Sequence, residues 1–146
     1  PLCFEKGEVM KLLDDKDNTY YDFLGGIAVN ALGHGHKDFI NALKNQLDKV
    51  VHTSSLYYIE NQAKLAQKLV ENTCAEKAFF FYCGAEANEG AFKLAKIYYY
   101  KKGLDKYEII TLDKSFHGRT LATVAATVTD TFKSKKTRLL IKLRQL

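Results

Sequence analysis

Apolar residues recur at spacings of three and four in three stretches of the chain, the pattern of amphipathic helices. The stretches run from about residue 36 to 51, from about 59 to 71 and from about 85 to 101. The apolar face of the first consists of Phe39, Ile40, Leu43, Leu47, Val50 and Val51. Gly103 follows the third stretch and suits a helix end. The pattern therefore predicts three helices, each with one buried face.

The remaining apolar segments have the pattern of strands. Val9–Leu13 and Thr19–Leu24 flank the polar cluster 14–18, whose Asp and Asn residues favour a turn, so we predict a hairpin. Ala78–Tyr82 is apolar without alternation, which suits a strand buried on both faces of a parallel sheet. Tyr107–Leu112 is the next predicted strand. Strand, helix and strand over this length predict a βαβ unit and an α/β fold.

The positive charge of the chain is concentrated at its C-terminal end. The 146 residues have a net charge of +5. Residues 131–146 contain six basic residues and no acidic one, so 16 of the 22 basic residues oppose all 17 acidic residues in the rest of the chain. This tail makes weak polyanion binding an alternative function.

Several classes of protein are disfavoured by the sequence. The three cysteines show no CxxC spacing, and no cluster has the pattern of a metal site, so neither disulfides nor a metal is expected. No apolar run reaches the roughly 20 residues of a membrane span, and no secretory signal is seen at the start. A cytoplasmic location is the resulting expectation.

Two segments carry candidate chemistry. The predicted turn Cys83-Gly84-Ala85-Glu86 leads from a strand into a helix, where backbone N–H groups and the helix dipole favour a phosphate. In the segment from Ser115 to Thr120, Phe116 could stack on a planar ring and Arg119 could bind a carboxylate with two hydrogen bonds. Either segment alone is also compatible with an ordinary connection. Both follow predicted parallel strands, so they should lie at one edge of the sheet.

Four blocks occur in a characteristic order along the chain. They are residues 24–34 (LGGIAVNALGH), 52–58 (HTSSLYY), 84–89 (GAEANE) and 115–120 (SFHGRT). This order resembles the class-III pyridoxal-phosphate-dependent aminotransferases, and within them most closely the acetylornithine aminotransferases of arginine biosynthesis. The resemblance covers roughly residues 5–127.

The resemblance implies a fold and a division of the chain. The fold would be α/β, that of the fold-type I pyridoxal-phosphate-dependent transferases, here incomplete. Residues 1–35 would be an N-terminal segment of the small domain, and residues 36–127 the start of the cofactor-binding large domain with its mainly parallel sheet. Residues 128–146 form a divergent basic tail.

The resemblance also implies roles for individual residues. Gly84 and Ala85 would hold the phosphate of pyridoxal 5'-phosphate through backbone N–H groups. Phe116 would stack on the cofactor ring, and Arg119 would bind the α-carboxylate of the substrate. The segment 55–58 would lie near the interface of a homodimer.

The implied reaction moves an amino group from N-acetylornithine to 2-oxoglutarate. Related members of the class act on ornithine, succinylornithine, succinyldiaminopimelate or 4-aminobutyrate, and these donors stay open. A fragment that binds pyridoxal phosphate or a polyanion without catalysis is the alternative of another class. No specific nucleic-acid partner and no membrane partner are expected.

One part of the implied machinery is absent from the sequence. The family uses a lysine that forms a Schiff base with the cofactor, and an Asp-Glu-x-Gln stretch that precedes it. The chain has no such stretch, and none of its lysines matches that position. We therefore assign no catalytic residue and expect a truncated fragment that is inactive alone. The family pattern departs near Val128, so a truncated or frame-shifted reading of a longer gene is our hypothesis.

Overall fold

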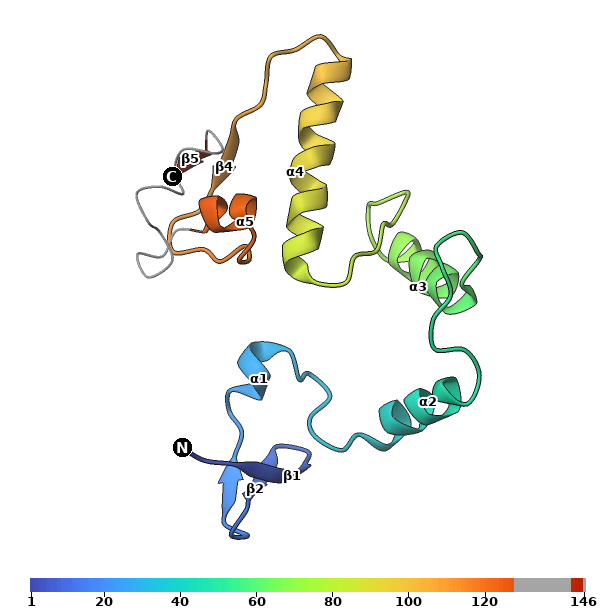
Figure 1. The fold of residues 1–146 in the computed structure, drawn as a ribbon, viewed down its shortest axis with the longest axis vertical. Coiled ribbons are helices and arrows are strands. Elements are labelled where there is room, and N and C mark those ends of the chain that lie inside the picture. The colour runs from blue at the N-terminus through green and yellow to red at the C-terminus, as the bar shows by residue number, and fades with distance from the viewer. Residues whose placement is uncertain (128–142, 146) are drawn as a thin grey trace. The chain divides into compact units, whose positions relative to one another are not determined.

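The computed structural model describes residues 1–127 and 143–145, which fall into two compact units, residues 1–63 and 64–146. The first unit contains β1 (Phe4–Glu8), β2 (Lys11–Asp14), β3 (Thr19–Tyr21), α1 (Gly25–Ala28) and α2 (Lys37–Leu47) (Figure 1). Helix α3 (Glu60–Glu71) runs across the division between the units. The second unit contains α4 (Gly84–Lys101), β4 (Ile109–Thr111), α5 (Leu121–Ala126) and β5 (Leu143–Gln145).

The first unit is built on a three-stranded antiparallel sheet with the order β1-β2-β3. The turn between β2 and β3 is held by Asp14, whose Oδ1 accepts the backbone N–H groups of Lys16 at 2.9 Å and Asn18 at 2.8 Å. This confirms the predicted hairpin, with Leu12 opposite Tyr20. Strand β1 was not predicted, because its charged sequence FEKGE carries no apolar alternation.

The connection after β3 contains a left-handed turn, α1. Gly25, Gly26, Ile27 and Ala28 all have positive φ, between 55° and 65°. Two of them are not glycine, and each such residue costs about 1–2 kcal/mol in this conformation. The connection then returns to the sheet, where Val9 and His34 exchange backbone hydrogen bonds of 2.8 and 2.7 Å. The pairing of Val9 with His34 joins the chain before and after the turn and so offsets part of this strain.

The three predicted helices are confirmed as α2, α3 and α4, with ends within a few residues of the expected ones. Their predicted buried faces are wrong, because no residue of these helices is buried. On α2, for example, Phe39 and Leu43 are each about half exposed, at 51% and 50%. Periodicity identifies which face of a helix is apolar, but burial also requires a second element packed on that face.

The predicted βαβ unit is only partly present. Strand β4 forms within the predicted segment and pairs in parallel with β5, with Ile109 opposite Leu143. The expected strand at 78–82 is wrong, since this segment has no ladder partner in the described part of the chain. Instead Phe81 packs on α4, and a Cβ on Gly90 would lie 2.1 Å from its ring. Continuous hydrophobicity could not reveal this, because a strand depends on a partner elsewhere in the chain.

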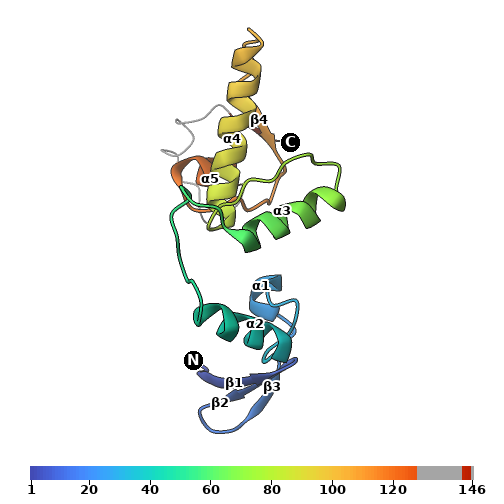
Figure 2. The same cartoon turned by 90° about the vertical axis from the view of Figure 1, so that its right-hand side faces the viewer.

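The buried residues of the second unit gather around α5. Thr123, Ala126 and Thr127 are fully buried, and Ala125 nearly so. Helix α5 lies beside the N-terminal half of α4 in both views (Figures 1 and 2). This packing positions the two segments that carry the candidate chemistry.

Candidate functional site

The N-terminus of α4 presents backbone N–H groups that the helix does not use. Cys83 precedes the helix in an extended conformation, and the first helical hydrogen bond runs from the N–H of Ala87 to its carbonyl at 3.0 Å. The N–H groups of Gly84, Ala85 and Glu86 therefore have no acceptor within the helix. A Cβ on Gly84 would meet none of the described residues within 4 Å, so there is open space beside the first residue of the helix. The arrangement suits an anion such as a phosphate.

The entry into α4 is fixed by its own first turn. The side chain of Glu86 reaches back and its Oε2 accepts the backbone N–H of Tyr82 at 3.1 Å. An acidic side chain in the first turn also interacts favourably with the positive end of the helix dipole. Glu86 therefore stabilises the start of the helix.

The segment 115–120 lies directly against the second residue of α4. Gly118 is buried and has a φ of +129°, a conformation that L side chains rarely adopt. A Cβ at this position would lie 2.7 Å from the Cβ of Ala85 and 2.7 Å from Oγ1 of Thr123. Only glycine allows this close approach. The two motifs that the sequence places at one sheet edge are therefore in contact.

Two side chains of α4 hold the same segment through polar contacts. Nδ2 of Asn88 donates to the backbone carbonyl of His117 at 2.8 Å. One residue further, Oε1 of Glu89 accepts a hydrogen bond from the hydroxyl of Thr120 at 2.5 Å. The segment is thus joined to α4 on both sides of Gly118.

Helix α5 supports the segment from its other side. Thr120 is the N-cap of α5 and forms a capping box with Thr123. The backbone N–H of His117 donates to Oγ1 of Thr127 at 2.9 Å, and the Thr127 hydroxyl donates to the carbonyl of Thr123 at 2.8 Å. The buried hydroxyl groups of Thr123 and Thr127 therefore accept backbone N–H groups on either side of Gly118.

The predicted site residues lie on this framework. Phe116 and Arg119 occupy exposed positions of the segment, with Phe116 60% exposed. Gly84 and Ala85 lie at the start of α4, where Ala85 touches the Gly118 backbone. The structure therefore brings the two motifs together, while the binding roles of these four residues stay predictions.

Sequence reasoning missed the residues that join the motifs. Asn88 and Glu89 belong to the block 84–89, in which only Gly84 and Ala85 have roles predicted from the sequence, yet Asn88 and Glu89 each contact the segment 115–120. One signal was available, since Thr120 and Thr123 stand at capping-box spacing before an apolar helix. The contact of Glu89 with Thr120 spans 31 residues and has no local pattern.

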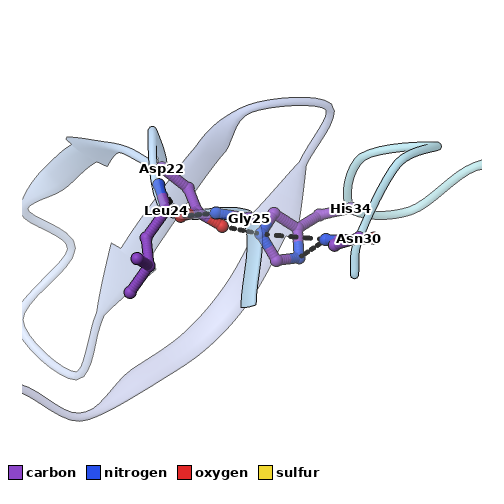
Figure 3. Close-up of polar contacts among 5 residues, drawn as sticks. All are labelled: Asp22, Leu24, Gly25, Asn30 and His34. Atoms are coloured by element: carbon purple, nitrogen blue, oxygen red, sulfur yellow. Dashed lines mark hydrogen bonds and ion pairs between the residues drawn. The ribbon is translucent and has the colours of Figure 1, made fainter. Parts of the chain in front are cut away.

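The first unit contains a separate polar cluster around His34 (Figure 3). Oδ1 of Asp22 accepts the N–H groups of Leu24 at 3.1 Å and Gly25 at 2.8 Å. Its Oδ2 lies 2.8 Å from Nε2 of His34, whose Nδ1 lies 3.1 Å from Nδ2 of Asn30. The hydrogen bond with His34, and then that with Gly25, lowers the pKa of Asp22 below its ordinary value.

Two further properties concern the described residues as a whole. Among residues 1–127 and 143–145, no group of three His, Cys, Asp or Glu side chains is arranged to hold a metal ion. Over the same residues, no helix has the length and apolar character needed to cross a membrane.

The fold and the paired motifs are those of a known family. The family model of the class-III aminotransferases matches residues 1–144, past Val128, and the chain belongs to this family. It is 50% identical over 127 residues to the acetylornithine aminotransferase of Agrobacterium fabrum, a match that covers 86% of this chain and 32% of that protein. The chain thus spans about a third of the length of such relatives.

Solved structures agree with this assignment. A transaminase from the marine bacterium Virgibacillus superposes with a TM-score of 0.90 at 26% identity, over 99% of this chain and 34% of that one. The omega transaminase from Pseudomonas jessenii in complex with PMP gives a TM-score of 0.90 at 26% identity, over 100% of this chain and 33% of that one. The α/β fold of class-III transaminases, fold-type I, is therefore confirmed for this chain.

Pyridoxal phosphate is the cofactor that family membership indicates. The start of α4 fits its phosphate, because three N–H groups there have no acceptor within the helix and the first residue among them is a glycine with open space beside it. The close approach of Gly118 to Ala85 keeps the segment with Phe116 next to this position.

Proposed function

We propose that this chain supplies the phosphate-binding and carboxylate-binding part of a pyridoxal-phosphate-dependent aminotransferase that uses N-acetylornithine and 2-oxoglutarate. The observation that carries the proposal is the contact of Gly118 with Ala85. It places a loop that bears an aromatic ring and a guanidinium beside the unused N–H groups of α4. A phosphorylated ring compound and a carboxylate could then be bound side by side.

Each residue has a separate task in this proposal. The N–H groups of Gly84 and Ala85 bind the cofactor phosphate with help from the helix dipole. Phe116 covers one face of the cofactor ring, and Arg119 pairs with the α-carboxylate of the amino acid. The bound cofactor supplies the electron sink for the chemistry at the substrate Cα. The residues of this chain bind and orient, and none of them is assigned a catalytic role.

The choice of N-acetylornithine is supported by the relatives. Proteins 47–50% identical to this chain carry the name acetylornithine aminotransferase. No residue of this chain is assigned to the distal end of the donor. Ornithine, succinylornithine, succinyldiaminopimelate and 4-aminobutyrate are therefore the competing donors in the test below.

We also propose a homodimer, a cytoplasmic location and a place in arginine biosynthesis for the protein that contains this chain. Support for the dimer comes from the segment 55–58, in which Leu56 is 86% exposed and Tyr58 fully exposed. Large apolar side chains in such a position are typical of interaction surfaces.

Binding is tested by titrating the purified chain with pyridoxal phosphate and following the absorbance of the cofactor. We expect saturable binding that inorganic phosphate displaces and that pyridoxal, which lacks the phosphate, does not reproduce. Replacement of Arg119 by Ala should leave the affinity for pyridoxal phosphate unchanged, because Arg119 is proposed to bind the carboxylate of the substrate and not the cofactor. Equal affinity for pyridoxal and its phosphate would contradict the phosphate site.

Activity is tested on the protein that contains this sequence, with 2-oxoglutarate as acceptor and each of the five donors in turn. Glutamate formation should be fastest with N-acetylornithine. A clear preference for 4-aminobutyrate or ornithine would replace the proposed donor and leave the binding roles intact.

A further inference from the structure

The loop that carries Phe116 and Arg119 is connected to α4 by a carboxylate whose function is not yet explained. Glu89 is half-buried and lies about one helical turn beyond the unused N–H groups at the start of α4. Its Oε1 accepts the hydroxyl proton of Thr120, the residue directly after Arg119. A role at the helix dipole would need no such contact, because that effect falls off within the first turn.

The carboxylate determines the direction of a short chain of hydrogen bonds. A threonine hydroxyl has a single proton, so Thr120 must accept from other groups once it donates to Glu89. Oγ1 of Thr123 lies 2.8 Å from Oγ1 of Thr120 and can supply that proton. Oγ1 of Thr123 in turn accepts the backbone N–H of Thr120 at 2.9 Å. Every hydroxyl proton then has an acceptor, and the backbone at Thr120 is held in one orientation.

We propose that Glu89 is a positioning residue, which aims Phe116 and Arg119 at a ligand held by the start of α4. It acts through Thr120 and Thr123 and touches neither cofactor nor substrate. This inference rests on the proposed function for the identity of the ligand, but the geometric effect exists without any ligand. Loss of the carboxylate should therefore weaken binding of the cofactor ring and leave binding of a free phosphate largely unchanged.

The first experiment measures hydrogen exchange of residues 115–120 in the 146-residue chain without ligand. In Glu89→Ala we expect the amide of Thr120 to exchange about 5- to 10-fold faster, as the loss of one charge-assisted hydrogen bond predicts. Glu89→Gln keeps an acceptor oxygen without the charge and should exchange at a rate between those of the wild type and Glu89→Ala. Glu86→Ala, which removes an acid one turn earlier on the same helix, should leave the segment unchanged.

A variant of similar size guards against a general loss of structure. Glu89→Met fills the same space and has good helix propensity but offers no strong acceptor. It should behave like Glu89→Ala while the circular dichroism of the chain stays native. Native helix content with unchanged exchange at Thr120 in both variants would overturn the proposal.

The second experiment compares affinities for pyridoxal phosphate and inorganic phosphate. Glu89→Ala should weaken binding of pyridoxal phosphate about 10-fold and that of phosphate less than about 2-fold, in line with one lost hydrogen bond. An equal loss for both ligands would show a damaged helix start and overturn the positioning role. A wild-type chain that binds no pyridoxal phosphate would refute the proposed function, and the exchange experiment would still decide the role of Glu89.

Discussion

Asp22 and His34 are joined by a contact of 2.8 Å between Oδ2 and Nε2, across twelve residues of chain. The contact closes the connection that contains the left-handed turn α1 (Figure 3). Nδ2 of Asn30 lies 3.1 Å from the other ring nitrogen, Nδ1. The histidine thus has a partner on each side.

Replacement of Asp22 by Ala should loosen this connection. The change removes the contact with His34 and the single oxygen, Oδ1, that accepts the N–H groups of Leu24 and Gly25. We expect hydrogen exchange at these two amides to accelerate roughly 10-fold. Asp15→Ala, an exposed acid in the neighbouring turn, is the matched control and should have no effect there. Unchanged exchange in Asp22→Ala would show that the turn is held by its backbone alone.

Acid should destabilise the N-terminal sheet. The side-chain hydrogen bond from Asn18, followed by two backbone N–H groups, lowers the pKa of Asp14 from its ordinary 3.8 despite the opposing effect of burial. In the unfolded chain Asp14 takes up its proton near the ordinary pKa, so the unfolded state binds more protons as the pH falls. The stabilisation is therefore present above that pKa and is lost as the pH drops through the folded value.

The measurement is the urea midpoint of NMR signals from residues 4–21, recorded from about pH 6 to about pH 2. The midpoint should fall over the lower half of this range. Asp14→Asn should lower the urea midpoint at neutral pH and weaken the dependence of this midpoint on pH. The pH dependence that remains should be the part that Asp22 contributes through its own lowered pKa. A wild-type midpoint that is constant down to pH 2 would refute the coupling.

Local patterns predicted much of the secondary structure and less of the packing. The periodicity of α2, α3 and α4 and the turn at Asp14 all depend on residues close together in the sequence. These elements could therefore be predicted from the sequence. A strand at 78–82 needs a partner from a distant segment, and the strand predicted there does not form. Strand β1 pairs with the neighbouring β2 and was missed because FEKGE lacks apolar alternation. The predicted site residues were recognised by their chemistry, whereas the Glu89–Thr120 contact became visible only in three dimensions.

Gly84→Ala should separate stability from binding. A methyl group at this position meets nothing within 4 Å, and alanine is the better helix former by up to about 1 kcal/mol. The chain should therefore unfold at an equal or slightly higher urea concentration. We expect the same methyl group to crowd an anion bound at the start of the helix, so affinity for phosphate and for pyridoxal phosphate should fall at least about 10-fold. Undiminished phosphate affinity would place the anion elsewhere.

Gly118→Ala should destabilise the second unit. The φ of +129° strains any other residue, and the new Cβ would meet Ala85 and Thr123 at 2.7 Å. We expect a loss of about 2–4 kcal/mol in the free energy of unfolding of the second unit. Urea denaturation followed by circular dichroism measures it. Gly103→Ala is a useful control, since it has a φ of +67° but no neighbour within 4 Å and should cost less.

Thr111→Val tests the last residue of β4. Thr111 is buried, and its hydroxyl has no hydrogen-bond partner among the described residues. Valine has nearly the same shape, so we expect stability to stay the same or rise by up to about 1–2 kcal/mol. Thr111→Ser keeps the hydroxyl, removes a methyl group and should be the less stable variant. A marked loss in Thr111→Val alone would show that the hydroxyl has a partner after all.

The contact of Gly118 with Ala85 also limits how this protein can vary. The φ of +129° reserves position 118 for glycine, and the small volume that Gly118 shares with Ala85 and Thr123 limits the size of the residue at 85. A library that randomises both positions should therefore return glycine at 118 and small residues at 85.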